Sequence, residues 1–412
     1  MKFDDLKLHP FLLKAVKDEG YINPTKIQEK AIPHILNKKD ILGSAQTGTG
    51  KTAAFALPIL HHMIVDKNEP SFKRINVLVV TPTRELAIQI GENFTTYSKY
   101  TDINNTVIFG GVKQIKQTDK LKKGVDILIA TPGRLLDLMS QGYISLKDIS
   151  YFVLDEADRM LDMGFINDIK KIIDKLPRQR QSLFFSATMP NNILKLSNSI
   201  LNYPEKVSVH QTSATADTID QLIYYTNKSD KRALLTDILK NKVLSQVLIF
   251  SRTKHGADRL VKNLKKKKIA AVAIHGDKSQ PQRQRALKSF KNKEVRVLVA
   301  TDIAARGIDI DKLNFVINFD IPNEPETYVH RIGRCGRAGE KGQSISICEP
   351  EENIYAKDIE KLIKSSLTEI KNHKFPQTDL PMNPQQRKEF EKQKQKKKQE
   401  FFANRKKNKR TK

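Results

Sequence analysis

A glycine-rich stretch, Ala45–Thr52, has the residue types and spacing of a phosphate-binding loop. It reads A-Q-T-G-T-G-K-T and follows a short apolar run. Gly48 and Gly50 allow backbone conformations in which successive N–H groups point at phosphate oxygens. Lys51 can then reach the β- and γ-phosphates, and the Thr52 hydroxyl can ligate Mg²⁺ at the start of a following helix. We therefore expect this loop to bind a nucleoside triphosphate with Mg²⁺.

The same loop also fits a dinucleotide-binding pattern, Gly48-x-Gly50-x-x-Ala53. That fold places an acidic residue about 20 positions later, at the end of a second strand. Here residues 61–66 are predicted to lie in or just after a helix, and the Lys-Thr pair within the loop suits a triphosphate better. Although Ala45 replaces the usual first glycine, we favour the triphosphate. The predicted contacts are Ala45, Gln46, Thr47, Gly48, Thr49, Gly50, Lys51 and Thr52.

An acidic pair after a later apolar run supplies the groups needed for hydrolysis. Asp155 and Glu156 directly follow Tyr151–Leu154. Asp155 can hold Mg²⁺ through its water shell, and Glu156 can orient or deprotonate the attacking water. An isolated acidic pair is more often a solvated strand end. Because a phosphate loop precedes it, this pair predicts an ATP hydrolysis site.

A basic, glycine-containing segment, His330–Arg337, can supply positive charge to the transition state. Charge develops near the γ-phosphate during hydrolysis, where the first half of the chain offers only Lys51. An arginine finger accelerates such reactions by roughly 10³ to 10⁵. The alternative is a basic helix end that binds a nucleic-acid phosphate. If Arg334 and Arg337 reach the γ-phosphate, ATP binding acts as a switch of domain geometry.

The elements that must position these residues alternate between buried strands and helices. After the loop, apolar runs such as Val77–Val80 each end in a polar tip, and helical patterns such as residues 85–97 and 165–176 separate most of them. This alternation is typical of a parallel, doubly wound sheet, whose ligands bind beyond the carboxyl ends of the strands. It resumes at Val247, so we predict an α/β fold with a second sheet that lacks a phosphate loop.

Composition divides the chain into four predicted parts: a first domain at 1–207, a linker at 208–218, a second domain at 219–365 and a basic low-complexity tail at 366–412. The linker has no periodicity. The tail holds 15 Lys and Arg against 5 Asp and Glu, and we expect it to be disordered because it cannot bury enough apolar surface. It either aids solubility or tethers RNA through counterion release.

The net charge of +27 over 412 residues indicates a polyanionic partner. Nucleic acid is favoured over a membrane, because no run of 18 apolar residues is present. The start, M-K-F-D-D, lacks the apolar core of a signal peptide. The two cysteines, Cys335 and Cys348, offer neither a disulfide framework nor zinc spacing. We therefore expect a cytoplasmic protein.

Several polar tips suit a sugar-phosphate backbone. Thr81–Arg84, Gly110–Gly111 and Thr131–Arg134 combine exposed backbone N–H groups, hydroxyls and an arginine. Each alone is more often a strand-end turn. Upstream, the Gln28 amide can pair with adenine N6 and N7 and Tyr21 offers a stacking face, although this segment alone reads only as a turn into a helix. The absence of Trp argues against base stacking as the main mode.

Taken together, these residues resemble a DEAD-box RNA helicase over nearly all of residues 1–350. The tetrapeptide Asp155–Asp158 reads D-E-A-D, and Pro82–Ala87, Ser186–Thr188 and His330–Arg334 match family motifs in the family's order. The resemblance implies two tandem RecA-like domains, a superfamily 2 helicase core, that bind ATP and RNA between them. Tyr21 where Phe is common, and Cys335 where Thr is common, do not bear on catalysis. H-G-D-K-S-Q at His275–Gln280 is similar to the RhlE-like bacterial branch.

The resemblance also implies residue roles. For adenine recognition it implies Phe3, Tyr21 and Gln28, and for the ribose it implies Asp309. For coupling of hydrolysis to domain movement it implies Asp158, Ser186, Thr188 and His330. For RNA contacts it implies Pro82, Thr83, Arg84, Gly111, Thr131, Pro132, Arg134, Arg252, Gly276, Gln280, Arg283, Thr301 and Asp302.

We therefore predict an RNA-stimulated ATPase that separates short RNA duplexes or remodels RNA–protein complexes. Its branch implies ribosome assembly or RNA turnover, with ribosomal precursors or RNA-decay proteins as partners, and we expect a monomer. The alternative is an ATP-dependent RNA clamp with little multiple-turnover unwinding. DNA unwinding is disfavoured by the resemblance.

Overall fold

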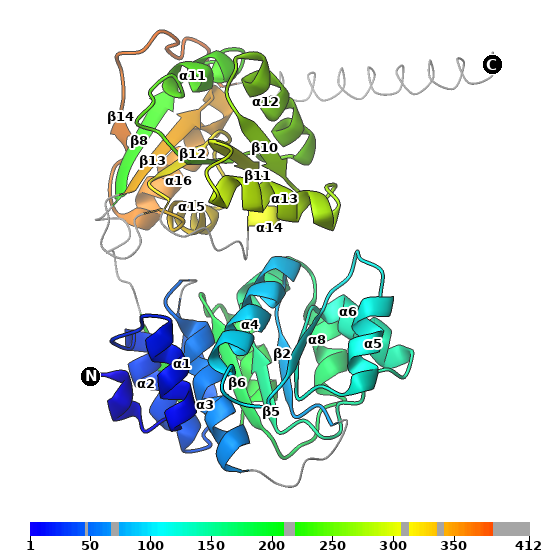
Figure 1. The fold of residues 1–412 in the computed structure, drawn as a ribbon. Helices are drawn as coiled ribbons and strands as arrows, with labels where there is room; N and C mark the ends of the chain where they lie inside the picture. Colours follow the sequence, from blue (N-terminus) through cyan, green and yellow to red (C-terminus); the bar gives the residue numbers. More distant parts are fainter. Residues whose placement is uncertain (46–47, 67–73, 210–218, 306–312, 336–341, 382–412) are drawn as a thin grey trace, which may run out of the picture. The chain divides into compact units, whose positions relative to one another are not determined.

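The computed structural model describes most of the chain as two compact units (Figure 1). The described residues are 1–45, 48–66, 74–209, 219–305, 313–335 and 342–381. We call residues 1–209 the first unit and residues 219–381 the second unit. The predicted linker lies outside the described residues except for 208 and 209, and Ser208 is the last residue of a strand.

The first unit contains a parallel sheet of seven strands in the order β3-β4-β2-β5-β6-β1-β7. Its central strands are short Val-, Ile- and Leu-rich runs that are buried along their whole length, as expected for strands covered on both faces. The strands are β1 (Ile41–Ser44), β2 (Val77–Val80), β3 (Asn105–Ile108), β4 (Ile127–Ala130), β5 (Tyr151–Leu154), β6 (Gln181–Ser186) and β7 (Glu205–Ser208).

Alternate residues of these strands enter two different cores. Val77 and Val79 pack in one core with the N-terminal helices, whereas Leu78 and Val80 pack in a second core on the opposite face. Helices therefore cover both faces of the sheet (Figure 1). The helical segments are η1 (Phe3–Leu6), α1 (Pro10–Asp18), α2 (Lys26–Leu36), α3 (Lys51–Val65), α4 (Arg84–Tyr97), α5 (Ile115–Lys123), α6 (Pro132–Ser140), α7 (Ala157–Asp162), α8 (Ile166–Ile173) and α9 (Asn191–Ile200).

The second unit repeats this architecture with a sheet in the order β10-β11-β9-β12-β13-β8-β14. The strands are β8 (Ile219–Tyr225), β9 (Val247–Phe250), β10 (Ala271–Ile274), β11 (Val297–Ala300), β12 (Phe315–Asn318), β13 (Gly342–Cys348) and β14 (Thr368–Glu369). The helical segments are α11 (Lys231–Ile238), α12 (Lys254–Lys266), α13 (Gln280–Lys291), α14 (Asp302–Ala305), α15 (Pro325–Ile332), η2 (Pro350–Glu352) and α16 (Asn353–Ile363).

The two sheets have the same strand order when the strands of each unit are counted from its own first strand, namely third, fourth, second, fifth, sixth, first, seventh. The predicted α/β fold with two parallel sheets is therefore confirmed. The carboxyl ends of parallel strands meet at one edge, so each unit has one edge suited to ligands. Below we call this the strand-end edge of the unit.

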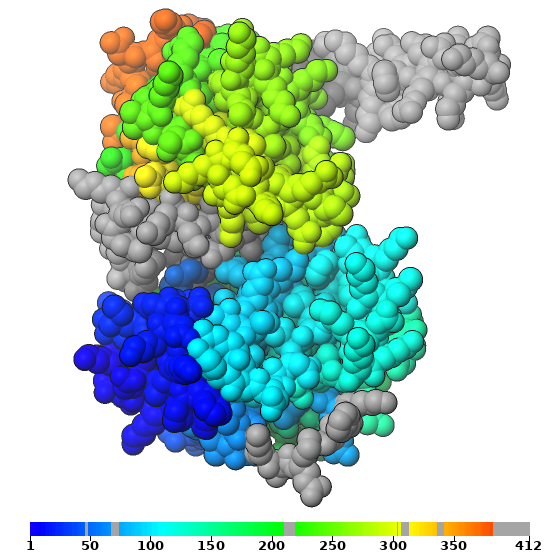
Figure 2. All heavy atoms as spheres, in the orientation of Figure 1, coloured from blue at the N-terminus to red at the C-terminus, as the bar shows by residue number. Residues whose placement is uncertain are grey.

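The C-terminal segment 366–381 packs against the rest of the second unit. β14 pairs with β8, with Thr368 opposite Leu222, and the backbone N–H groups of Thr378 and Asp379 donate to the side chain of Asn227. Figure 2 shows this segment in orange at the surface of the second unit. The region predicted as a tail thus begins with residues that complete the sheet, and residues 382–412 lie outside the described part.

Candidate active site and nucleic-acid interface

The phosphate loop starts where β1 ends. The Ala45 N–H donates to the Ser186 carbonyl at 3.1 Å and so extends the β1–β6 pairing by one residue. Gly48 and Gly50 then adopt positive φ angles of 83° and 89°, which favour glycine. Helix α3 begins at Lys51, so its free N–H groups lie at the strand-end edge. Gln46 and Thr47 lie outside the described residues.

Lys51 and Asp155 form the buried centre of this edge. The Lys51 Nζ lies 3.7 Å from the Asp155 Oδ1, and their side chains are only 5% and 3% exposed. Neither atom has a hydrogen-bond partner among the described residues. Burial raises the pKa of Asp155 to about 6, although Lys51 opposes this shift. Buried polar atoms without partners are costly, and a phosphate anion and a hard cation would satisfy them. The site therefore fits ATP with Mg²⁺, for which Thr52 and Asp155 are the available oxygen ligands.

Glu156 occupies a left-handed backbone position, with φ 58° and ψ 49°, just before α7. Its Oε2 accepts a hydrogen bond from the Arg159 Nη1 at 2.6 Å, and both side chains are buried. The carboxylate is thus fixed next to Asp155 by an ion pair at i, i+3 spacing. The ion pair thus orients the Glu156 carboxylate at the carboxyl end of β5, from which it could orient or deprotonate a water molecule.

Asp158 links α7 to the segment after β6. Its Oδ2 accepts hydrogen bonds from the backbone N–H groups of Ala187 and Thr188 and from the Thr188 hydroxyl, at 2.9–3.1 Å. The Ser186 hydroxyl accepts from the Asp158 N–H at 3.2 Å and donates to the Thr188 carbonyl. Three of the four residues predicted to couple hydrolysis to movement therefore form one hydrogen-bonded unit.

The residues predicted to recognise adenine lie on the N-terminal side of the loop. The Phe3 and Tyr21 rings are stacked, with centroids 6.4 Å apart. The Gln28 amide accepts from the Thr25 N–H and donates to the Gly50 carbonyl at 3.0 Å. Gln28 therefore connects α2 to the phosphate loop. An amide has two donor hydrogens and two acceptor lone pairs, so one of each remains for a base.

The predicted RNA contacts of the first unit lie after β2, β3 and β4 on the same edge. The Thr83 hydroxyl accepts from the Leu86 N–H at the start of α4, and the Arg84 guanidinium lies against Gly111, whose φ is 77°. Arg134 donates to the Val112 carbonyl and to Gln117. Pro82, Thr131 and Pro132 are buried at the adjoining strand ends. These loops follow three neighbouring strands, β3, β4 and β2, and bring two guanidinium groups to one edge of the sheet.

In the second unit, α15 carries His330 and ends just before Arg334. The Arg334 side chain is 5% exposed, and its backbone N–H donates to the Arg331 carbonyl at 3.2 Å. Arg337 and Asp309, predicted to contact the γ-phosphate and the ribose, lie outside the described residues.

The predicted RNA contacts of the second unit also lie at its strand-end edge. Thr301 follows β11, and Asp302 begins α14. Gly276 follows β10 and is exposed, while Gln280 and Arg283 lie in the first turn of α13. Arg252 follows β9, but its guanidinium is tied to the Glu352 carboxylate at 2.6 Å and to the Ile321 carbonyl.

Sequence reasoning missed two arginines, each of which pairs with a carboxylate at the strand-end edge of its own unit. Arg159 pairs with Glu156, and Arg331 donates two hydrogen bonds to the Asp302 carboxylate, at 2.6 and 2.9 Å. The i, i+3 spacing of Glu156 and Arg159 was a usable signal. Arg331 lay inside the predicted basic segment, but its partner is remote in the sequence, so its role could not be inferred.

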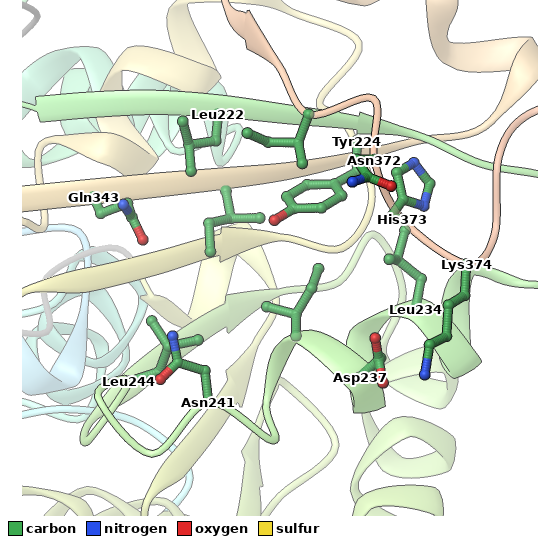
Figure 3. Close-up of a pocket in the computed structure, with 13 residues that line it drawn as sticks. Leu222, Tyr224, Leu234, Asp237, Asn241, Leu244, Gln343, Asn372, His373 and Lys374 are labelled. Carbon is green, nitrogen blue, oxygen red and sulfur yellow. The ribbon is translucent and has the colours of Figure 1, made fainter.

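A cavity of about 520 Å³ in the second unit lies away from these residues. Figure 3 shows Tyr224 and His373 at one side and Asp237 and Lys374 below them. None of the predicted site residues lines it, so it is separate from the candidate active site. Among the described helices, none combines the length and apolar character needed to cross a bilayer.

Comparisons with known proteins agree with this geometry. A family model described as DEAD/DEAH box helicase matches residues 25–196, and one described as helicase conserved C-terminal domain matches residues 230–339. An ATP-dependent RNA helicase CshA from Limosilactobacillus reuteri is 43% identical over 90% of this chain and 74% of the relative. An ATP-dependent RNA helicase DeaD from Haemophilus influenzae is 40% identical over 90% of this chain and 60% of the relative.

Solved structures show the same similarity. S. cerevisiae Dbp5 bound to RNA and ADP BeF3 has a TM-score of 0.79 and 32% identity, over 90% of this chain and 95% of that chain. A DEAD box protein from the hyperthermophile Methanococcus jannaschii has a TM-score of 0.52 and 39% identity, over 90% of this chain and 99% of that chain.

Proposed function

The chain belongs to the DEAD-box family of ATP-dependent RNA helicases, with two tandem RecA-like domains, and from this premise we propose its finer function. It is an RNA-stimulated ATPase that locally separates short RNA duplexes or remodels RNA–protein complexes, in ribosome assembly or RNA turnover. The observation that carries the ATPase assignment is the buried Lys51–Asp155 pair, in which the Lys51 Nζ and the Asp155 Oδ1 have no hydrogen-bond partner among the described residues.

The first unit holds the triphosphate. The loop glycines and the N-terminus of α3 present N–H groups to phosphate oxygens, and Lys51 neutralises charge at the β- and γ-phosphates. Thr52 and Asp155 would hold Mg²⁺, which when bound neutralises the charge that develops on the phosphates. Because Asp155 is buried, its carboxylate meets little competition from water.

Glu156 orients and deprotonates the attacking water. Its carboxylate is anchored through Oε2 by Arg159, which fixes the orientation of the acceptor. A fixed carboxylate beside the γ-phosphate can orient the water and take its proton as the oxygen attacks phosphorus. Asp158, Ser186 and Thr188 then transmit the state of this segment to the strand-end loops, because one carboxylate holds both backbone and hydroxyl donors.

In this proposal, Arg334 and Arg337 stabilise the transition state of hydrolysis. Two guanidinium groups near the γ-phosphate stabilise the charge that develops as the bond to the leaving group breaks. Because both arginines belong to the second unit, turnover requires the second unit to approach the nucleotide. RNA that is bound by both units would favour this approach. This dependence explains why RNA would stimulate hydrolysis.

RNA binding in this proposal uses the sugar-phosphate backbone. Arg84 and Arg134 supply positive charge, and the hydroxyls and N–H groups of Thr83 and Gly111 supply hydrogen bonds. Such contacts read few base edges, so the enzyme would accept many sequences. We propose that it acts as a monomer in the cytoplasm and that ribosomal precursors or RNA-decay proteins are its partners.

The test is an ATPase titration of the full chain with single-stranded RNA, matched DNA and no nucleic acid, followed by multiple-turnover unwinding of a short RNA duplex. We expect RNA to stimulate turnover more than DNA does, and several duplexes to be separated per enzyme. Equal stimulation by DNA would contradict the RNA assignment. ATP-dependent RNA binding with only a single round of separation would instead identify an RNA clamp.

A further inference from the structure

The second unit contains a lysine in the position that Lys51 has in the first unit. Lys51 begins the helix that follows the sixth strand in the sheet order, β1, and Lys231 begins the helix that follows the corresponding strand, β8. Asp155 follows the fourth strand in the order, β5, and Asp320 lies two residues after the corresponding strand, β12. The Lys231 Nζ lies 3.4 Å from the Asp320 Oδ1. The second unit therefore repeats the lysine–aspartate pair of the nucleotide site.

The partners of this second pair differ from those of the first. The Lys231 Nζ donates to the Glu352 Oε2 at 2.8 Å and lies 3.8 Å from the Glu349 Oε2. Lys231 is 3% exposed and Glu352 is 1% exposed. Burial alone would lower the pKa of Lys231, but Glu352, Asp320 and Glu349 raise it above its ordinary value. The lysine is therefore charged, and carboxylates of the chain occupy the place of phosphates.

Glu349 and Glu352 come from the segment that follows β13, the fifth strand in the order. In the first unit the corresponding segment follows Ser186, the last residue of β6, and contains Thr188. The Glu352 carboxylate accepts hydrogen bonds from Lys231, from Arg252 and from the backbone N–H of Ile321. Each of its oxygens is satisfied, which makes this cluster a rigid internal element.

The cluster is connected to the residues that face RNA in the proposed function. Through Glu352 it anchors the Arg252 guanidinium at 2.6 Å. Through Asp320 it reaches Arg331, whose Nη1 donates to the Asp320 carbonyl at 2.6 Å. Arg331 in turn holds Asp302 by two hydrogen bonds. Two predicted RNA contacts, Arg252 and Asp302, are therefore held by one network that begins at Lys231.

We propose that Lys231 is a positioning residue for RNA. Together with Asp320, Glu349 and Glu352 it occupies the strand-end edge of the second unit as an internal substitute for a nucleotide phosphate, and it thereby holds Arg252 and Asp302 in the geometry that binds the RNA backbone. This inference rests on the proposed function, because it names residues that set the RNA affinity of the same enzyme. It does not require Lys231 to touch RNA or ATP.

The test measures ATP hydrolysis by the full chain as a function of RNA concentration. Lys231→Met removes the charge and the terminal donor but keeps most of the apolar part of the side chain. We expect the RNA concentration for half-maximal stimulation to rise about tenfold, since small displacements of contact groups are costly. The affinity for ATP without RNA should stay within about twofold of wild type, because the phosphate loop and Lys51 lie in the other unit.

Lys240→Met is the matched control. Lys240 lies two residues beyond the end of α11 and pairs with Asp237 at 2.8 Å, but its side chain is 70% exposed. An exposed pair contributes little, so this variant should behave as wild type in both titrations.

A second variant separates positioning from folding. Lys231→Met leaves several carboxylates without their cation and lowers the melting temperature. Lys231→Met combined with Glu352→Gln removes one charge of each sign and breaks the ion pair between Arg252 and Glu352. We expect this double variant to melt closer to wild type and to keep the tenfold loss of RNA response.

A double variant that is folded and responds to RNA as wild type does would overturn the inference. A loss of ATP affinity equal to the loss of RNA response would overturn it also, because it would indicate a general structural defect. Absence of RNA stimulation in the wild-type protein would instead contradict the proposed function itself, and with it this inference.

Discussion

The strand-end edges of the two units differ in one respect that decides their roles. Both have the same strand order, and both place a lysine and an aspartate close together. In the first unit the Lys51 Nζ and the Asp155 Oδ1 have no hydrogen-bond partners among the described residues, whereas Lys231 is surrounded by carboxylates. The same fold thus becomes a ligand site when its polar atoms are left unsatisfied, and a scaffold when the chain satisfies them.

This difference has an energetic reason. A buried charge is costly unless it is paired and hydrogen-bonded. In our proposal, ATP binding offsets this cost in the first unit, whereas Glu349 and Glu352 of the chain offset it in the second unit. Stability is therefore expected to be lower where function requires an open site.

The largest effect should come from Glu156→Gln. Glu156 directly follows Asp155 in the first unit, whereas Ile321 follows the corresponding Asp320 in the second unit. Only the first unit therefore has a second carboxylate at this position. We expect the rate of ATP hydrolysis to fall by about 10² to 10⁴, the usual contribution of a general base. ATP binding should persist, so the variant should remain on RNA when ATP is present. Single-turnover hydrolysis and RNA filter binding measure these two results. Unchanged turnover would reject this role of Glu156.

Lys51→Met should lower turnover by about 10² to 10³, since it removes a charge that stabilises the transferred phosphoryl group. It should also weaken nucleotide binding. RNA binding without nucleotide should stay near wild type, because the proposed RNA contacts lie on other loops. A fluorescent ATP analogue and labelled RNA measure the two affinities. Equal losses in both would show that the substitution disturbs the whole unit.

The comparison also predicts that the two lysines contribute unequally to the free energy of unfolding. Lys231→Met should lower the free energy of unfolding by about 3 to 5 kcal/mol, because it breaks a buried ion pair and leaves carboxylates uncompensated. Lys51→Met should cost about 1 kcal/mol or less, because the Lys51 Nζ makes no hydrogen bond to be lost. Denaturant unfolding without nucleotide measures both. Equal losses in the two variants would remove the distinction between an open and a satisfied pair.

The affinity for ATP with Mg²⁺ should depend on pH. Burial raises the pKa of Asp155 to about 6 in the ligand-free protein. Below this pH the carboxyl is protonated and cannot ligate a cation, so affinity should fall as pH decreases, by about tenfold per pH unit. Asp155→Asn should bind more weakly and show a flat profile. Titrations between pH 5 and 8 would test this, and a flat wild-type profile would contradict it.

The smallest effect should come from deleting residues 382–412, which lie beyond the segment that completes the second sheet. We expect RNA binding at low salt to weaken about threefold to tenfold, and the difference to vanish at high salt, because basic side chains act by releasing counterions. The melting temperature should not change. Deletion of residues 366–412 is the contrasting variant, since it also removes β14 and should destabilise the second unit. Unchanged affinity at low salt would leave the tail as a solubility device.

The sequence predicted the sheet architecture and the local groups of the site well, because both depend on short patterns. Apolar runs located the central strands, and glycines at 48 and 50 located the loop. Three strands were not predicted from the sequence, namely β7, β8 and β14. β7 is largely exposed, β8 is only partly buried, and β14 is two exposed residues at a sheet edge, so none shows the continuous apolar run of a central strand.

Contacts between distant residues could not be predicted. Lys231 and Glu352 are 121 positions apart, and Asp302 and Arg331 are 29 positions apart. Each residue alone reads as a solvated surface charge, and only the fold shows that they are buried together. Gln28 illustrates the same limit, since its amide was assigned to adenine but also bonds the Gly50 carbonyl.

The most direct test of the account is the number of ATP molecules bound by the full chain, measured by titration calorimetry with a non-hydrolysable analogue and Mg²⁺. We predict one site per chain, with its affinity weakened in Lys51→Met and unchanged in the double variant Lys231→Met, Glu352→Gln. A second site on the wild-type chain, or binding that survives Lys51→Met with unchanged affinity, would contradict the claim that the first unit holds an open phosphate site and the second a filled one.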